Sequence, residues 1–529
     1  MLPRVEAAVL NEMNKVMVQY KVLRAIKWHE IESTAIKIRS QMLIKIKMKA
    51  NGIYDKVTAR LAAGGNNQPE GSYGATYAPT VDETATKLVI AAFHADAVCN
   101  NYVHELEMPS FDVPAAFLHI PLDKKSNPQQ IVMYLQKDLP HPLAGQWVEV
   151  IGALYGLKQS NNLFETDIRK QFTKAGFISC PSDPCVYVKF HPTDTRMKCI
   201  VCMHVDDGIC IHNCPQLYKQ LIDVLEEKYG PLQHHSQADS FLGQTLARHK
   251  RGSITFGMEG YIKKLALREG IEPSESIRVP SELDLFHPPS DITPYDLKLY
   301  QRLIGGLIYV LKIRHDVHKE IIYLATRTKS PTVSDYNKAR QGLVFLQSTV
   351  KDGPTFYTEE GPVLYGSADA SYGVHEDSRS QSGYYVSIGR NSVPIYCHTG
   401  KQMDSVSQSA MEAEYVCVGE LGKKVLWCRY LLADVGFAQK GPTTFLQDNN
   451  SCISLAKVSP IPRKSRHIHI RHHAIRDMCM KKLAVMEHVR TELLTSDLLT
   501  KPLTADKFIP FKFAILNMRY YTAYKAKTI

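Results

Sequence analysis

The feature that most constrains this chain is an apolar run at residues 201–211 that two adjacent carboxylates interrupt. It reads Val-Cys-Met-His-Val-Asp206-Asp207-Gly208-Ile-Cys-Ile. Both flanks have the composition of buried β-strand, and Asp-Asp-Gly predicts the tight turn of a hairpin between them. Carboxylates at the tip of an apolar hairpin are costly unless a positive charge lies beside them, and a divalent metal ion is the usual solution. On this segment alone, an ordinary solvated Asp-Gly turn is the simpler interpretation.

Length and composition indicate several domains and an intracellular location. The chain has 529 residues, 44% of them hydrophobic, which is enough for three to four domains. Lys and Arg total 64 against 53 Asp and Glu, and the net charge of +11 suits a polyanionic partner without proving one. The twelve cysteines are scattered, and Cys199 and Cys202 lack the second pair that a zinc site needs. Because no signal peptide precedes residue 30 and no apolar run approaches membrane-spanning length, we expect a soluble protein with no membrane partner.

A change of composition at 351–362, from Lys-Asp-Gly-Pro to Glu-Glu-Gly-Pro, marks the clearest domain boundary. Alternating and helical patterns follow it. They predict strands at 363–369, 383–389, 393–398 and 404–408, a helix at 409–435, a strand at 443–448 and a helix at 450–457.

The helix predicted after this boundary carries two acids with different expected roles. Ser409 and Glu412 match a capping box at its start. An apolar stripe begins at Cys417, and Glu414 lies three residues before it, so Glu414 continues the stripe towards the core. Glu412 lies about 200° from Glu414 around the helix axis, at roughly 100° per residue. We therefore expect Glu412 to face solvent or to cap the helix. A carboxylate on a buried stripe needs a metal or a cation.

Three further acids lie at the ends of predicted elements: Asp369, Asp448 and Asp497. Any one of them alone would be a cap or a surface acid. Converging with Glu414, the set could hold two Mg²⁺ ions for in-line hydrolysis of a phosphodiester.

Together the two regions resemble the pol product of copia-type LTR retrotransposons, specifically its reverse transcriptase followed by RNase H. Each matching motif is short, but their order and spacing follow the family across nearly the whole chain. The motifs are Ala59-Arg60-Leu61, Thr76-Tyr77-Ala78-Pro79, Asp112-Val with Ala116-Phe117-Leu118, Leu154-Tyr-Gly-Leu-Lys-Gln159, Val205-Asp206-Asp207, Phe241-Leu242-Gly243, Tyr300 with Leu303-Ile-Gly305, Ala368-Asp369, Ser380 with Ser382-Gly383-Tyr384, Glu412-Ala-Glu414-Tyr415, Asp448-Asn449, Arg466-His467-Ile468 and Leu499-Thr-Lys-Pro502.

The resemblance implies a multidomain α+β and α/β fold. A right-hand polymerase with fingers, palm and a thumb-like part is followed by a connection and an RNase H-like α/β domain. The implied divisions are an N-terminal and fingers segment at 1–75, palm and fingers at 76–240, thumb-like and connection region at 241–355, RNase H-like domain at 356–505 and a C-terminal tail at 506–529.

The resemblance also assigns roles in the polymerase half. Asp112 and Asp206 correspond to the metal-holding acids of the palm, with Asp207 as the second acid of the hairpin. Phe117 corresponds to the aromatic gate that rejects a 2′-hydroxyl, although plain core packing would also explain it. Arg60 corresponds to the cation that holds the triphosphate, unless it is an ordinary surface arginine.

Three more residues belong to substrate-contacting loops of the family. Lys158 and Gln159 correspond to the loop that contacts the template base and the incoming nucleotide, and Gly243 lies in the primer grip. In the nuclease half, the metal-binding set is Asp369, Glu414, Asp448 and Asp497.

The implied function is RNA-directed DNA polymerase with ribonuclease H activity, dependent on Mg²⁺, for which Mn²⁺ can substitute. Its partners would be an RNA template, a DNA primer, the RNA–DNA hybrid, deoxynucleoside triphosphates and other retrotransposon pol or gag products. Its location would be the cytoplasm, in a virus-like particle for an active element, or the nucleus. The chain shows no zinc knuckle, protease motif or integrase triad, so we expect a polymerase–nuclease piece.

The alternative is a folded, catalytically inactive nucleic-acid-binding remnant. Four departures from the family pattern favour it. His204 replaces a tyrosine, Ser160-Asn161-Asn162 replaces Ala-Pro-Arg, Pro114 cannot donate a ladder hydrogen bond, and His469 replaces an acid. The run of histidines from His467 to His473 could bind a transition metal, but a basic face for nucleic acid is the favoured interpretation.

Overall fold

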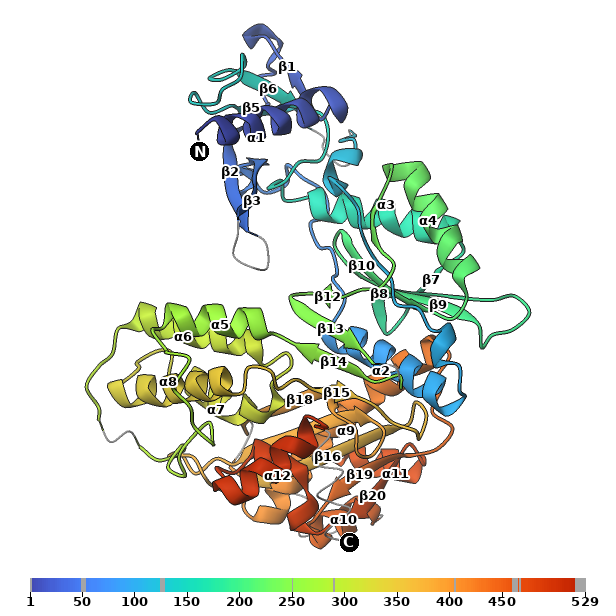
Figure 1. The fold of residues 1–529 in the computed structure, drawn as a ribbon, viewed down its shortest axis with the longest axis vertical. Helices are drawn as coiled ribbons and strands as arrows, with labels where there is room; N and C mark the ends of the chain where they lie inside the picture. The colour runs from blue at the N-terminus through green and yellow to red at the C-terminus, as the bar shows by residue number, and fades with distance from the viewer. Residues whose placement is uncertain are drawn as a thin grey trace. The chain divides into compact units, whose positions relative to one another are not determined.

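The computed structural model describes residues 2–48, 54–123, 129–249, 251–288, 291–403, 406–458, 465 and 468–518. The chain packs as two units, each built from two stretches of sequence. Unit 1 comprises Met1–Val81 and Glu107–Gln237, and unit 2 comprises Asp82–Leu106 and Ala238–Ile529. Figure 1 labels their helices and strands. None of the described helices is both long and apolar enough to cross a lipid bilayer.

Unit 1 contains two sheets, with strand orders β1-β6-β5-β2-β3 and β11-β4-β10-β9-β8-β7. Its elements are α1 (Leu2–Asn14), the π-helical turn η1 (Lys15–Gln19), β1 (Leu23–Ala25), η2 (Trp28–Glu30), β2 (Ile36–Met48), β3 (Tyr54–Ala63), η3 (Gly65–Asn67), β4 (Ser110–Asp112), η5 (Ala116–His119), β5 (Ile131–Tyr134), β6 (Trp147–Val150), α3 (Ser160–Lys174), β7 (Ile178–Cys180), β8 (Asp183–Phe190), β9 (Lys198–His204), β10 (Asp207–His212), α4 (Pro215–Tyr229) and β11 (Gln233–His235).

The second of these sheets forms because its strands are apolar on both faces and two amphipathic helices supply partners for one face. Residues 198–203 of β9 are all buried, as the run of Cys, Ile, Val and Met there predicts. Helix α3 buries Phe164, Ile168 and Phe172 at four-residue intervals, and α4 buries an equivalent stripe. Phe172 stacks on Tyr187 of β8 with ring centroids 4.1 Å apart, which joins α3 to the sheet.

Unit 2 contains a four-stranded sheet of order β12-β13-β14-β15 and a five-stranded sheet of order β18-β17-β16-β19-β20. Its elements are α2 (Glu83–Cys99), η4 (Val103–Glu105), β12 (Ser240–Phe241), β13 (Gln244–Arg248), β14 (Ile254–Gly257), α5 (Glu259–Arg268), α6 (Leu297–Val310), η6 (His315–Val317), α7 (His318–Ala325), α8 (Val333–Ser348), β15 (Thr355–Phe356), β16 (Leu364–Ser371), β17 (Gln381–Ile388), β18 (Pro394–Lys401), α9 (Ala410–Asp434), β19 (Thr443–Gln447), α10 (Asn450–Lys457), η8 (Ile470–His473), α11 (Ala474–Met480), β20 (Ala484–His488), η9 (Thr491–Leu493), η10 (Thr495–Leu499) and α12 (Ala505–Ile515).

The five-stranded sheet is mixed, and its central strands are covered on both faces. Strands β18, β17 and β16 run antiparallel, whereas β16, β19 and β20 run parallel. Helix α9 and η10 both contact β16 and β17, and α2 contacts α9, β17 and β18. All eight residues of β17 are therefore buried. Helix α2 comes from early in the sequence, yet Phe93 of α2 meets Phe437 edge to face, with ring centroids 5.5 Å apart.

The strand and helix predictions for this region are confirmed with two exceptions. The first three predicted strands correspond to β16, β17 and β18, and the later helix–strand–helix to α9, β19 and α10. The strand predicted at 404–408 is wrong where the structure describes it, because 406–409 are irregular, and 404–405 lie outside the described residues. Strand β20 was not predicted. Its five residues alternate between buried and exposed for too short a stretch to stand out.

Candidate active sites

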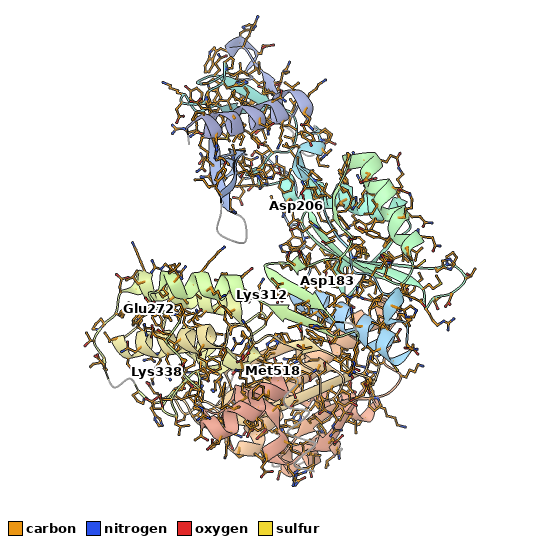
Figure 2. All side chains as sticks on the ribbon, viewed as in Figure 1. Asp183, Asp206, Glu272, Lys312, Lys338 and Met518 are labelled. Carbon is orange, nitrogen blue, oxygen red and sulfur yellow. The ribbon has the colours of Figure 1, made fainter. Side chains whose placement is uncertain are left out.

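In unit 1, the two adjacent carboxylates lie at the hairpin between β9 and β10 (Figure 2). The turn residues are Val205 and Asp206, whereas Asp207 and Gly208 already belong to β10. The prediction of an Asp-Asp-Gly turn was therefore displaced by one residue. Val205 has a φ of 60°, which is unfavourable for a β-branched residue and marks local backbone strain.

Strand β4 brings a third carboxylate to this hairpin. Asp112 is the register partner of Asp207, and Phe111 is the partner of Gly208. A Cβ atom on Gly208 would overlap the ring of Phe111, so glycine is what lets β4 and β10 approach. Asp112, Asp206 and Asp207 thus come together from two segments that are distant in the sequence.

Burial and mutual repulsion destabilise the charged form of these carboxylates, and a bound cation would offset this. Burial, reinforced by Asp206 and Asp207, raises the pKa of Asp112 to about 6. Burial also raises the pKa of Asp206, and Asp207 adds to the effect. The positive charge of Arg60 acts in the opposite direction on both. Oxygen ligands of this kind fit a hard divalent cation such as Mg²⁺ or Mn²⁺.

A cavity of about 610 Å³ opens beside the carboxylates within unit 1. Asp112 and Asp206 line it together with three basic side chains, Lys15, Lys45 and Arg60. The guanidinium of Arg60 lies over the ring of Tyr155, 4.0 Å from its centroid, which fixes its direction. The cavity therefore combines acids that suit a metal with cations that suit a polyphosphate.

The other predicted substrate contacts of unit 1 lie around this cavity but, among the described residues, they do not line it. Phe117 is half-buried and packs edge to face against Tyr155 and Phe164, with centroids 5.1 and 5.9 Å away, so it serves the core. Lys158 donates from Nζ to the carbonyl of Gln68 at 3.0 Å. Gln159 is buried, and its amide oxygen accepts from Gln68 at 3.2 Å.

Gly243 lies in unit 2, at the turn between β12 and β13. Leu242 and Gly243 have φ values of 50° and 79°, as a two-residue hairpin turn of type I′ requires. The close approach found at Gly243 is to the chain itself, because a Cβ atom there would overlap the hydroxyl of Tyr309. That hydroxyl donates to the carbonyl of Leu242 at 3.1 Å.

The departures from the family pattern are accommodated locally. Strand β4 ends at Asp112, so Pro114 lies outside the ladder, and the expected loss of a ladder bond is wrong. Ser160 exchanges hydrogen bonds with the backbone of Leu154, at 2.8 and 3.1 Å, and begins α3. His204 pairs with Asp207, and its buried Nδ1 has no hydrogen-bond partner.

In unit 2, three carboxylates converge at one end of the mixed sheet. Asp369 lies on β16, Glu414 on the first turns of α9 and Asp448 directly after β19. One oxygen atom from each lies within 4.8 Å of the others, and in the part of the chain that the structure describes, no other three carboxylates meet this spacing. The parallel pairing of β16 with β19 explains the meeting of Asp369 and Asp448, because both strands end at the same edge.

Asp497 joins this cluster through a basic residue that the sequence analysis did not assign. Lys501 lies 2.8 Å from Asp497 and 3.3 Å from Asp369, measured from Nζ to carboxylate oxygens. The hydroxyl of Thr500 also donates to Asp369. On the other side, the amide of Gln447 donates to Glu414 at 2.9 Å. Both Thr500 and Lys501 lie inside the Leu-Thr-Lys-Pro motif, and that motif was the one sign in the sequence that they belong to the site.

Burial and mutual repulsion both raise the pKa values of acids in this cluster. Burial, reinforced by Asp369, raises the pKa of Glu414 to about 9. The same two causes raise the pKa of Asp497 to about 7. Burial lowers the pKa of Lys501, but Asp369 and Asp497 outweigh it and the net shift is upward. The cluster carries more negative charge than Lys501 neutralises, and this donor set fits Mg²⁺.

Glu412 was expected either to face solvent or to cap the helix, and the structure shows the capping arrangement. Glu412 is buried, and its carboxylate accepts from the backbone N–H of Gln408 at 2.8 Å. The side chain of Ser409 accepts from the backbone N–H of Glu412, which confirms the capping role. The segment before α9 covers Glu412, and this contact is invisible to helical periodicity.

The described histidines after α10, which are His469, His472 and His473, do not form a group that could hold a metal ion. Arg466 and His467 lie outside the described residues. The Nδ1 atom of His473 lies 3.0 Å from the hydroxyl of Tyr415, and His472 lies 3.6 Å from a carboxylate oxygen of Glu420.

Comparison with known proteins agrees with this geometry. Residues 31–282 match the family "Reverse transcriptase (RNA-dependent DNA polymerase)". The chain is 27% identical over 473 residues to a retrovirus-related Pol polyprotein from transposon RE1 of Arabidopsis thaliana, covering 88% of the chain and 31% of that protein. It is 24% identical over 485 residues to the Pol polyprotein of transposon TNT 1-94 of Nicotiana tabacum, covering 89% and 35%. The chain thus spans about a third of the length of these relatives.

A solved structure supports the fold. The foamy viral protease-reverse transcriptase, in complex with double-stranded DNA, superposes with a TM-score of 0.54 at 12% identity. The match covers 91% of this chain and 69% of that one. The mixed α/β, reverse transcriptase-like polymerase fold is therefore confirmed. By its motifs, its fold and these matches, the chain is similar to the Pol polyproteins of copia-type retrotransposons, and its residues 31–282 match the reverse transcriptase family.

Proposed function

We propose that the chain is an RNA-directed DNA polymerase that extends a DNA primer on an RNA template. The observation that carries the proposal is the cavity in unit 1, where Asp112 and Asp206 face Arg60, inside the segment that matches reverse transcriptases. Its substrates would be the template, the primer and deoxynucleoside triphosphates.

In this proposal the chain's own residues position the reactants. Asp112 and Asp206, with Asp207 beside them, would hold divalent ions. When bound, such ions would lower the pKa of the primer 3′-hydroxyl and neutralise the leaving pyrophosphate. Arg60, held over Tyr155, binds the triphosphate at the mouth of the same cavity. Phe117 packs edge to face against Tyr155, which lines the cavity, and through this contact it would limit the space for a 2′-hydroxyl at the nucleotide site.

Three other predicted residues would act on the substrates by holding a loop or a turn in place. They are Lys158, Gln159 and Gly243. Lys158 and Gln159 are joined to the loop at Gln68 by hydrogen bonds, which keeps that loop in one conformation against the start of α3. Gly243 forms a rigid hairpin turn against Tyr309, which suits a primer-supporting element.

We further propose that unit 2 cleaves the RNA strand of the hybrid. Asp369, Glu414, Asp448 and Asp497 would hold two divalent ions, which activate water and stabilise the leaving oxygen. Gln447 orients Glu414, and Lys501 offsets part of the charge of Asp369 and Asp497 before a metal binds. The strand order and the acids at the ends of β16 and β19 support an RNase H-like domain.

A nucleic-acid-binding remnant is the second candidate, and His204 favours it. Its unsatisfied Nδ1 is buried beside the acidic hairpin, where the family usually has tyrosine. A remnant would retain the fold and the basic surface but would not catalyse.

Primer extension on a primed RNA template, with Mg²⁺ or Mn²⁺, tests both candidates. We expect extension by the unmodified chain, loss of extension in Asp206→Asn and retained hybrid cleavage in that variant. Glu414→Gln should give the reverse result, which makes each variant the control for the other. Hybrid binding without extension in either metal would refute the polymerase and favour the remnant. Extension that survives in Asp206→Asn would refute the assignment of the site.

A further inference from the structure

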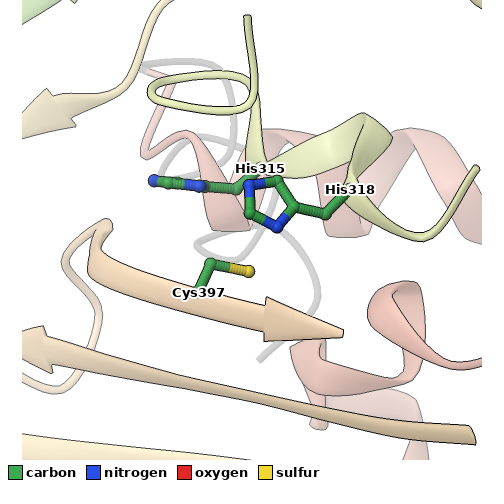
Figure 3. Close-up of side chains that lie close together, drawn as sticks. All are labelled: His315, His318 and Cys397. Atoms are coloured by element: carbon green, nitrogen blue, oxygen red, sulfur yellow. The ribbon is translucent and has the colours of Figure 1, made fainter. Parts of the chain in front are cut away.

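A second group of metal-binding side chains lies in unit 2, away from the carboxylates. His315 of η6, His318 at the start of α7 and Cys397 of β18 each place one ligand atom within 4.8 Å of the others. Figure 3 shows the three side chains grouped between the helical segment and the strand. The two histidines are three residues apart, a spacing that puts them on one face of a helical turn. Their ring centroids are 5.3 Å apart.

The hydrogen bonds at the histidines leave lone pairs unused. Nδ1 of His315 is buried and has no hydrogen-bond partner, although His315 is only 3% exposed. Nε2 of His318 lies 2.8 Å from the carbonyl of Leu311. A carbonyl only accepts, so this Nε2 carries the hydrogen and Nδ1 of His318 keeps its lone pair. A histidine whose one nitrogen donates to a carbonyl is a common arrangement in metal sites.

Burial affects the ionisation of all three side chains. Burial, helped by His318, lowers the pKa of His315 well below its ordinary value, and burial lowers that of His318 to about 4. Burial raises the pKa of the Cys397 thiol, but the charge of Lys87 acts against this. Lys87 is itself paired with Glu83 at 2.7 Å.

We propose that His315, His318 and Cys397 bind a borderline-soft divalent transition metal of the Zn²⁺ class. Two imidazoles and a thiolate select such ions over Mg²⁺, which prefers oxygen. A tetrahedral ion with bonds of about 2.0–2.3 Å holds its ligand atoms about 3.3–3.7 Å apart, so the group contracts only slightly on binding. No fourth His, Cys, Asp or Glu joins the group among the described residues, which leaves that position to water.

The nearby acid and arginine are not available as ligands. Asp316, between the two histidines, is paired with Arg314 at 2.7 Å, and both side chains are fully buried. Cys397 as a whole residue is only partly buried. A bound ion would link η6 and the start of α7 to β18, and would thereby stabilise the packing of this helical segment on the mixed sheet. This site is separate from the carboxylates of the proposed nuclease.

Cobalt substitution of the full-length chain tests the proposal. Co²⁺ bound by a thiolate gives a charge-transfer absorption that carboxylate-bound Co²⁺ lacks. We expect one thiolate-bound Co²⁺ per chain, apart from any Co²⁺ held by the carboxylates. The thiolate absorption should be lost in Cys397→Ser and in His315→Gln, and retained in Cys428→Ser, a buried cysteine of α9 outside the group. Zn²⁺ should displace the cobalt, and it should raise the thermal midpoint of the unmodified chain by more than that of Cys397→Ser.

Two results would overturn the site. One is an unmodified chain that shows no thiolate absorption with Co²⁺, in which case the three side chains only fill the interior. The other is an absorption that persists in Cys397→Ser, which would assign the thiolate to another cysteine. Glu414→Gln serves as a further control, because it removes a carboxylate ligand and should leave the thiolate absorption intact. Circular dichroism of each variant shows whether a loss of absorption comes from unfolding.

Discussion

Replacing Glu414 by glutamine separates the cost of a buried acid from its use as a ligand. Without metal, the folded chain holds Glu414 at a pKa of about 9, against an ordinary value of 4.5 for a glutamate side chain. At pH 7 the folded state therefore keeps a proton that the unfolded state releases, and this costs about 3 kcal/mol of stability. Glutamine carries no such penalty, and its side-chain oxygen can still accept the hydrogen bond from Gln447.

Glu414→Gln should thus increase the free energy of unfolding by about 3 kcal/mol at pH 7 in metal-free buffer, which raises the thermal midpoint by about 5 °C. The sign follows from the raised pKa: the penalty on the unmodified chain is absent below pH 4.5 and grows as pH rises towards 9. The difference between the two proteins should therefore vanish in acid and widen in alkali. Thermal melts in chelator across this range measure it.

Addition of Mg²⁺ should reverse the order. The ion removes the penalty in the unmodified chain and raises its midpoint, whereas Glu414→Gln has lost a ligand and should respond little. Glu412→Gln is the matched control, because it loses only a charged cap of about 1 kcal/mol and should keep the full Mg²⁺ response. The reasoning fails if Glu414→Gln is less stable than the unmodified chain in chelator, or if Mg²⁺ stabilises both equally.

Three further predictions rest on other parts of the molecule. Gly243→Ala should lower the free energy of unfolding by about 1–3 kcal/mol in urea titrations. The reason is that Gly243 has a positive φ and that a Cβ atom there would overlap the hydroxyl of Tyr309. An unchanged urea midpoint would contradict that geometry. Burial lowers the pKa of His94 to about 3, so the folded state binds a proton at His94 less readily than the unfolded state does. The free energy of unfolding should therefore fall as the pH drops below 6.5, by about 2 kcal/mol at pH 5. In denaturant titrations, His94→Leu should show a weaker dependence on pH. The affinity for an RNA–DNA hybrid should fall steeply with salt in a fluorescence titration, by about one power of salt concentration for each phosphate contact, and a flat response would argue against a nucleic-acid substrate.

Local patterns in the sequence found most of the acids, and the family resemblance added Asp112, but neither showed what surrounds them. The apolar flanks of Asp206 and Asp207 could only form a hairpin, yet its turn begins one residue earlier because Val205 takes a positive φ that propensity argues against. The stripe along α9 correctly placed Glu414 in the core. It left open whether Glu412 faces solvent or caps the helix, because periodicity describes one helix and not the segment that folds over its N-terminus.

The sequence contains weaker indications of residues whose roles depend on contacts between distant elements. Lys501 lies in a recognised motif, but its contacts with Asp369 and Asp497 depend on how η10 packs against β16. His315 and Cys397 are far apart in the sequence, and neither lies in a metal-binding spacing. Only the packing of α7 against β18 brings them together.

The position of α2 in the chain has a consequence for synthesis on the ribosome. Phe93 emerges early, but its partner Phe437 is translated about 340 residues later. At 5–20 residues per second this helix waits roughly 20–70 s with an apolar surface uncovered. Thirteen of its seventeen residues are buried once unit 2 is complete. The nascent chain therefore offers a chaperone a long window on α2, and a prematurely terminated product would carry that helix permanently exposed.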